Sequence, residues 1–127
     1  MSIKLFLKNE QSTNLLGLIF TKILNSHKEG LVVSLKGEMG SGKTTLVRAI
    51  IKELGHVGSV PSPTYTLIEP YRISNKPIYH IDLYRIEEDL ELEFIGWNDF
   101  EFNSLIFIEW PERVHRVYKS SDIMIDF

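Results

Sequence analysis

The chain contains 127 residues, of which 43% are hydrophobic, and it carries a formal net charge of -3. This length predicts one domain over residues 1–127, built around one hydrophobic core. The acidic balance argues against autonomous binding to DNA or RNA, and the absence of cysteine excludes disulfides, thiolate metal sites and a thiol nucleophile. No segment approaches the ~20 apolar residues of a membrane span, and the N-terminus lacks a signal-peptide pattern, so we expect a cytoplasmic protein without membrane contacts.

The N-terminal part of the sequence predicts a strand followed by a helix. Residues 2–7, "SIKLFL", alternate between polar and apolar side chains, as strands do. Residues 11–30 predict a helix that Ser12 or Thr13 caps and Gly30 ends. Its apolar side chains recur at helical spacing, at Leu15, Leu16, Ile19, Phe20, Ile23 and Leu24.

A second strand and a second helix follow directly. The run "LVVSL" at 31–35 is short and rich in β-branched residues, which indicates a buried strand. Residues 43–55 predict an amphipathic helix that ends at Gly55. Its apolar stripe consists of Leu46, Ile50 and Leu54.

The remaining sequence predicts a loop and then mostly strands. The loop covers 57–66, and a hairpin of two strands follows, joined by the turn 74–76. Beyond the hairpin we expect a short acidic helix, a buried strand, a short helix and a final strand, at 87–96, 103–111, 111–120 and 122–127. Together these elements predict an α/β fold with a mixed, mostly parallel sheet flanked by helices.

The segment "GEMGSGKTT" contains the phosphate-loop pattern G-x-x-x-x-G-K-[ST] between the second strand and the second helix. Glycines allow successive backbone N–H groups to point at one anion, and the helix N-terminus adds its positive dipole end. The pattern predicts that Lys43 reaches the β- and γ-phosphates and that the Thr44 hydroxyl binds Mg²⁺. The predicted nucleotide-binding residues are Gly37, Glu38, Met39, Gly40, Ser41, Gly42, Lys43, Thr44 and Thr45. The alternative is a glycine-rich turn that binds nothing.

Two carboxylates are candidates for the metal site and for catalysis. Glu109 closes the apolar run "LIFIE", which is the Walker B arrangement, and it would face the crevice at the strand ends. Asp82 lies in "YHIDLYR", where it shares a strand face with His80 and Tyr84. The alternative for each acid is a solvated strand face. His80 and Asp82 are too few for a zinc site.

Other polar and aromatic residues have weaker signals. The loop "SVPSPTYT" suits a switch segment that senses the γ-phosphate through Thr64 or Tyr65, although an ordinary loop fits the pattern equally well. Trp110 next to Glu109 could stack on a ligand or pack in the protein. A basic edge, interpreted as a solvated helix face, is formed by Arg113, Arg116 and Lys119.

Comparison with known nucleotide-dependent proteins narrows the function. A guanine-specific N-K-x-D motif is absent, because "NKPI" has Ile78 in place of the acid, and we find no transporter ATPase signature. A minimal kinase of small molecules and a nucleotide sensor without turnover remain as alternatives to an ATPase.

The segments "GEMGSGKTT", "SPTYTL", "YHIDLYR" and "IEWPE", in this order, resemble the TsaE family of small P-loop ATPases. This family acts in bacterial tRNA threonylcarbamoyladenosine biosynthesis. The resemblance covers residues 31–112, and the family usually continues with a further strand after the segment that corresponds to 122–127.

The resemblance implies slow, Mg²⁺-dependent ATP hydrolysis in partnership with the TsaB–TsaD complex, with ATP and ADP as bound nucleotides. That complex transfers a threonylcarbamoyl group to the adenosine next to the tRNA anticodon, and the ATPase resets it between turnovers, so contact with tRNA would be indirect. Lys43 would neutralise the transferring group, Thr44, Glu109 and Asp82 would surround the metal, and Thr64 would lie in the switch loop. Adenine would bind near the start of the first helix, at Ser12 and Thr13.

Overall fold

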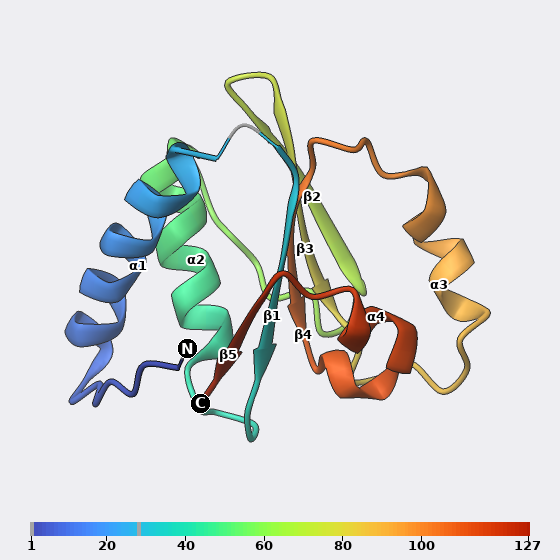
Figure 1. The fold of residues 1–127 in the computed structure, drawn as a ribbon, viewed down its shortest axis with the longest axis horizontal. Coiled ribbons are helices and arrows are strands. Elements are labelled where there is room, and N and C mark those ends of the chain that lie inside the picture. The colour runs from blue at the N-terminus through green and yellow to red at the C-terminus, as the bar shows by residue number, and fades with distance from the viewer. Residues whose placement is uncertain (1, 28) are drawn as a thin grey trace.

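The computed structural model describes residues 2–27 and 29–127 and contains a five-stranded sheet with the strand order β2-β3-β4-β1-β5 (Figure 1). Strands β1, β3, β4 and β5 run parallel, and β2 is antiparallel to β3. The α/β fold with a mixed, mostly parallel sheet is therefore confirmed. The strands are β1 (Leu31–Lys36), β2 (Ile68–Ile73), β3 (Lys76–Asp82), β4 (Leu105–Glu109) and β5 (Ile123–Asp126).

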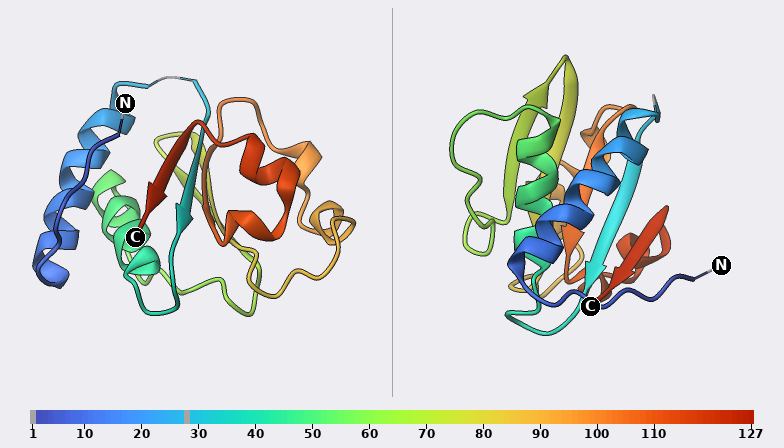
Figure 2. Two further views of the ribbon diagram at one scale, coloured as in Figure 1. Left: turned by 60° about the horizontal axis from the view of Figure 1, so that its bottom comes forward. Right: turned by 90° about the vertical axis from the view of Figure 1, so that its left-hand side faces the viewer.

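Helices cover both faces of the sheet. Helices α1 (Glu10–Asn25) and α2 (Lys43–Leu54) lie on one face, whereas α3 (Glu91–Phe94) and α4 (His115–Lys119) lie on the other (Figures 1 and 2). The short 3-10 turns η1 (Trp97–Asp99) and η2 (Pro111–Arg113) accompany the second pair. Each face has its own buried cluster of aliphatic side chains, so the sheet is a central layer between two cores.

The two central strands are buried on both faces, as their apolar sequences predict. Val33 of β1 pairs with Phe107 of β4, and neither side chain is exposed. The next pair on that face is Leu35 with Glu109. On the other side of β4, Glu109 pairs with Asp82 of β3. The parallel register therefore brings both candidate carboxylates to the edge of the sheet where β1 enters the phosphate loop.

The hairpin of β2 and β3 confirms the predicted pair of strands and their turn. Ile73 pairs with Lys76 across a two-residue loop of Ser74 and Asn75. Both loop residues have positive φ, 49° and 64°, as in the type I′ turns that match the twist of a hairpin. The strands are shorter than the segments 65–73 and 77–86 that the sequence predicts: β2 begins at Ile68 and β3 ends at Asp82.

The strand predicted for residues 2–7 is wrong. These residues form no helix or strand, and the side chains of Ile3, Leu5 and Phe6 are largely exposed. A strand needs a hydrogen-bonded neighbour, and alternation of side chains supplies none. The segment runs along the outside of the molecule without joining the sheet (Figure 2).

Helix α1 differs from its prediction at both ends. Asn9 is the N-cap, because its side chain accepts a hydrogen bond from the backbone N–H of Ser12 at 2.9 Å. The helix ends at Asn25, so neither the predicted caps nor the predicted end at Gly30 is correct. Part of the predicted range, at Lys28, lies outside the described residues.

The buried face of α1 consists mainly of small side chains. Thr13, Gly17, Thr21 and Leu24 are buried, whereas half of the predicted apolar stripe is exposed, at Leu15, Ile19 and Ile23. A Cβ atom added to Gly17 would lie 2.8 Å from the Cβ of Ala49 on α2. The two helices therefore pack through their small residues, which the hydrophobic periodicity alone does not indicate.

The remaining predicted elements are confirmed with shorter bounds. Helix α2 matches its prediction and ends at Gly55, whose N–H bonds to the carbonyl of Lys52. Residues 57–66 contain no helix or strand. The predicted acidic helix is reduced to the single turn α3, and the predicted helix at 111–120 is divided into η2 and α4. Within the described residues, no helix is both long and apolar enough to span a membrane.

Candidate functional site

The phosphate loop connects β1 to α2 and depends on two glycines with positive φ. Gly40 has a φ of 78° and Gly42 a φ of 108°, values that side chains other than glycine rarely tolerate. Gly42 is also the N-cap of α2 and makes no side-chain cap. The first N–H groups of α2 thus have no capping side chain and remain available to an anion.

A cleft of about 550 Å³ lies at the carboxyl ends of the strands, next to this loop, and we call it the strand-end cleft. It is lined by residues 39–45, Thr64, Tyr65, Asp82, Tyr84, Arg85, Glu109 and Trp110. All the predicted catalytic and metal-binding residues are among them. Of the predicted nucleotide-binding residues, Gly37 and Glu38 do not line the cleft and instead contact Lys43 through their carbonyl groups.

The Lys43 side chain is buried and points back over the loop. It is 5% exposed, and its ammonium group donates hydrogen bonds to the carbonyl oxygens of Gly37 and, at 3.2 Å, Glu38. The same Nζ atom lies 4.2 Å from the ring centroid of Trp110. Carbonyl dipoles and an aromatic face are neutral partners, and within the described part of the chain no carboxylate forms an ion pair with Lys43.

Glu109 is the most highly connected acid of the cleft. It is 3% exposed, and its Oε1 and Oε2 accept hydrogen bonds from the Thr44 hydroxyl at 2.9 and 3.0 Å. His80 approaches the same carboxylate, with Nε2 2.5 Å from Oε2. The alternative of a solvated acid is therefore wrong for Glu109.

Asp82 lies beside Glu109 and is 4% exposed, so the alternative of a wet strand face is wrong here as well. Its Oδ2 accepts a hydrogen bond from the Thr64 hydroxyl at 3.1 Å, and its Oδ1 accepts one from the Tyr84 N–H at 2.8 Å. Burial raises the pKa of the Asp82 carboxyl, and the nearby charge of Glu109 raises it further, against the opposing effects of these hydrogen bonds and of His80.

The oxygen atoms at this corner suit a hard cation. Mg²⁺ prefers hydroxyl, carboxylate and phosphate oxygens, and Thr44, Glu109 and Asp82 supply the first two kinds. Among the described residues, no group of three or more His, Cys, Asp or Glu side chains could hold a metal ion by itself. These three side chains could supply part of the ligand set of such a cation.

Aromatic and basic side chains form the rim of the cleft. Tyr65 is 82% exposed, and the guanidinium of Arg85 lies 5.1 Å from its ring centroid. Trp110 has a positive φ of 58°, and its ring lies 4.9 Å from that of Tyr84. The guanidinium of Arg113 lies 5.1 Å from the ring centroid of Tyr84. The predicted basic edge is exposed to solvent at Arg113, Arg116 and Lys119.

The sequence does not indicate which residues contact the predicted site residues and hold them in place. His80 and Asp82 share the face opposite Tyr79 and Ile81, as the alternation predicts, and His80 is fully buried. Its contact with Glu109 requires the β3–β4 register, which no local pattern specifies. Tyr84 and Arg85 also line the cleft, and their place after the strand end at Asp82, with one residue between, is a signal in the sequence.

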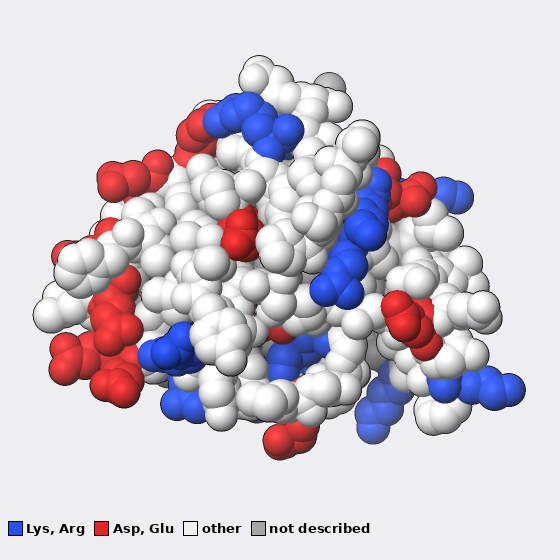
Figure 3. All heavy atoms as spheres, turned by 180° about the vertical axis from the view of Figure 1, so that it is seen from behind, with Lys and Arg blue, Asp and Glu red and all other residues white. Residues whose placement is uncertain are grey.

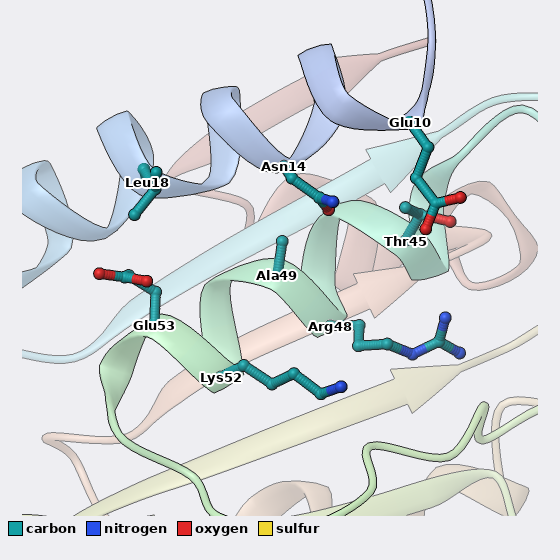
Figure 4. Close-up of a pocket in the computed structure, with 8 residues that line it drawn as sticks. All are labelled: Glu10, Asn14, Leu18, Thr45, Arg48, Ala49, Lys52 and Glu53. Carbon is teal, nitrogen blue, oxygen red and sulfur yellow. The ribbon is translucent and has the colours of Figure 1, made fainter.

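A second cavity of about 310 Å³ lies between α1 and α2, and we call it the interhelix cavity. Figure 4 shows Glu10, Asn14 and Leu18 along α1 facing Thr45 and Ala49 on α2. Thr45 lines both hollows. The residues suggested for adenine binding, Ser12 and Thr13, line neither the strand-end cleft nor the interhelix cavity. Both donate hydrogen bonds to Asn9 instead. Their neighbours Glu10 and Asn14 do line the interhelix cavity.

The surface charge is mixed. On the face shown in Figure 3, acidic and basic side chains lie interspersed, and the described residues there form no continuous basic surface. This agrees with the net charge of -3.

Comparison with known proteins gives a consistent family. Residues 7–127 match the family described as "Threonylcarbamoyl adenosine biosynthesis protein TsaE". The chain is similar to the tRNA threonylcarbamoyladenosine biosynthesis protein TsaE of Haemophilus influenzae, with 42% identity over 98% of this chain and 81% of that protein. It is 40% identical to the Nostoc protein of the same name, over 87% of this chain and 69% of that one.

A solved structure shows the same fold. The crystal structure of YdiB from Bacillus subtilis superposes with a TM-score of 0.62 and 27% sequence identity, covering 86% of this chain. This chain spans 64% of the length of YdiB. The family match over nearly the whole chain, and the similarity to relatives at about 40% identity, show that this chain belongs to the TsaE family.

Proposed function

We propose that this protein binds ATP with Mg²⁺ in the strand-end cleft and hydrolyses it slowly. The observation that carries this proposal is the convergence of the Thr44 hydroxyl and the buried Glu109 carboxylate, 2.9 Å apart, at the mouth of a glycine loop. A glycine-rich turn that bound nothing would have no need to bury a carboxylate against it, because such burial is costly.

The side chains of the cleft have separate tasks in this proposal. The N–H groups at the start of α2 bind the phosphates, and Lys43 moves from its carbonyl partners to the transferring group. Thr44, Glu109 and Asp82 would hold Mg²⁺, which would supply positive charge beside the phosphates. The Thr64 hydroxyl donates a hydrogen bond to Asp82 at 3.1 Å, and Thr64 senses the γ-phosphate through that carboxylate.

We further propose that ATP turnover serves threonylcarbamoyladenosine formation on tRNA, in a complex with TsaB and TsaD. The family and the names of its relatives support this role. The formal net charge of -3 supports an indirect relation to tRNA, in which the partner proteins hold the nucleic acid.

Steady-state hydrolysis of Mg²⁺-ATP tests this proposal. The purified chain is measured alone and then with TsaB, TsaD and tRNA, using TsaB and TsaD without this chain as the control. We expect slow turnover that rises when the partners are added. If the partners leave turnover unchanged, the proposed action in a complex with TsaB and TsaD is wrong. ATP binding without turnover under all these conditions would identify a nucleotide sensor.

A further inference from the structure

A buried histidine contacts the Glu109 carboxylate from the interior of the protein. His80, on β3, has no exposed side-chain surface and does not line the strand-end cleft, whereas Glu109 does. Its Nε2 lies 2.5 Å from Oε2 of Glu109. The carboxylate is thus contacted by the core on one side and by Thr44, at the cleft, on the other.

The hydrogen-bonding chemistry assigns a direction to this contact. An ionised carboxylate only accepts hydrogen bonds, so the Nε2–H of His80 donates to Glu109. The other ring nitrogen, Nδ1, is buried and has no hydrogen-bond partner among the described residues. Burying an unpaired polar atom is destabilising, and an aliphatic side chain like that of the adjacent Ile81 would avoid this cost. The imidazole therefore contributes little to the core and supplies one donor to Glu109.

We propose that His80 is the positioning residue of this site and holds the Glu109 carboxylate against the Thr44 hydroxyl. A glutamate side chain has three rotatable bonds, and the Thr44 hydroxyl is its one other side-chain partner among the described residues. With the donor removed, the carboxylate turns away from Thr44 and the two oxygen ligands of the cation separate. The consequence for Mg²⁺ rests on the proposed function, whereas the positioning itself is a property of the nucleotide-free protein.

Four variants separate positioning from packing. His80→Phe and His80→Leu both remove the donor and fill the buried space with different shapes. His80→Gln keeps a donor, because its amide nitrogen occupies the place of Nε2 more closely than a shorter side chain could. Ser34→Ala is the matched control: Ser34 is buried on β1, the strand on the other side of β4, and its hydroxyl contacts Ser121 rather than Glu109.

The first measurement is a crystal structure of each nucleotide-free variant. We expect the Thr44–Glu109 contacts to be lost in His80→Phe and His80→Leu and kept in His80→Gln and Ser34→Ala. The second is the Mg²⁺ concentration that gives half-maximal ATP turnover, together with ADP affinity in the absence of metal. Loss of an outer hydrogen bond to a ligand weakens metal binding about 10-fold or more, so that midpoint should rise by this factor in the two donor-free variants only. ADP affinity without metal should stay unchanged in all four.

Several results would overturn the inference. Intact Thr44–Glu109 contacts in the folded donor-free variants would show that His80 does not position the carboxylate. A wild-type Mg²⁺ midpoint in these variants would remove the link to the metal. Failure of both to fold, with Ser34→Ala folded, would assign His80 to the stability of the core. If the wild-type protein binds no nucleotide, the proposed function fails, and the crystal structures still decide the positioning.

Discussion

The N-terminal end of helix α2 and its flank against α1 differ in the burial of their charged side chains. Its N-terminal end lies at the strand-end cleft, where Lys43 is 5% exposed and holds a charge inside the protein. Its flank lies against α1, where Ala49 meets Gly17 and the charged residues of the interhelix cavity, such as Lys52 and Glu53, are exposed.

This difference in burial indicates which of the two hollows is functional. Both hollows have charged side chains in their lining, but the strand-end cleft has three that are buried, at Lys43, Asp82 and Glu109. Hydroxyl groups donate hydrogen bonds to its two carboxylates. Burying a charge is costly unless it is paired and hydrogen-bonded, and such groups gathered in a cleft are typical of functional sites. We therefore expect changes at the cleft to act mainly on turnover, and changes at the α1–α2 contact to act mainly on stability.

The largest effect is expected for Lys43→Ala. Removing the ammonium group leaves the phosphate charge without its nearest side-chain cation, so ATP turnover should fall about 100- to 1000-fold, the range for loss of one charge-stabilising group. Thr44→Ala should act in the same direction. The control is Lys52→Ala, on the same helix but at the exposed interhelix cavity, which should keep wild-type turnover. Wild-type hydrolysis by Lys43→Ala would refute the site.

A somewhat smaller effect is expected for Glu109→Ala. The carboxylate bonds to the Thr44 hydroxyl, and its loss removes an oxygen ligand of the cation while the phosphate loop remains. Turnover at saturating ATP should fall about 10- to 100-fold, consistent with a lost metal contact. ADP affinity measured by calorimetry in EDTA should remain that of the wild type. An equal loss of metal-free ADP affinity would indicate that Glu109 supports the structure of the loop instead.

The phosphate loop could be predicted from sequence because its determinants are local. Gly40 and Gly42 adopt positive φ within the loop itself, and the flanking strand and helix have clear hydrophobic patterns. Glu109 could be placed at a strand end for the same reason, whereas Asp82 was predicted inside a strand that in fact ends at this residue. That they lie side by side follows from the parallel β3–β4 register, which the α/β prediction made plausible without specifying it.

The errors concern features that depend on distant parts of the chain. The alternation in residues 2–7 is typical of a strand, but no sheet edge pairs with it in the described structure. The buried face of α1 was misplaced because Gly17 allows close approach to α2, which leaves Leu15 and Ile19 exposed. The His80–Glu109 contact likewise joins residues on different strands, 29 positions apart.

Gly17→Ala tests the other side of the comparison. The added Cβ would lie 2.8 Å from that of Ala49, so the helices must move apart. Such overpacking costs about 1–3 kcal/mol, and the better helix propensity of alanine offsets up to about 1 kcal/mol of this. The melting temperature should fall by several degrees, while turnover well below that temperature stays at the wild-type value.

The double variant Gly17→Ala/Ala49→Gly is the matched control for this change. It moves the methyl group from one helix to the other and relieves the close contact. The double variant should therefore be more stable than the sum of the two single-variant effects predicts. Additive losses would show that the two positions are not coupled. If the folded Gly17→Ala variant lost turnover, the α1–α2 contact would affect activity as well as stability. The distinction between the flank of α2 and its N-terminal end would then be wrong.

The smallest effect is expected for Asp82→Asn, measured as the stability of the nucleotide-free protein against pH. Burial raises the pKa of the Asp82 carboxyl, so between its unfolded and folded pKa values the native state binds more protons than the unfolded state. Stability from the protonated form is present below the ordinary Asp pKa of about 3.9 and is lost as pH rises through the folded pKa. The uncharged amide avoids this loss, so the variant should melt higher than the wild type at neutral pH, and the difference should shrink on acidification. A difference that is constant with pH would instead assign the effect to the hydrogen bonds of Thr64 and Tyr84, and the cleft would then hold Asp82 by geometry rather than against the cost of its charge.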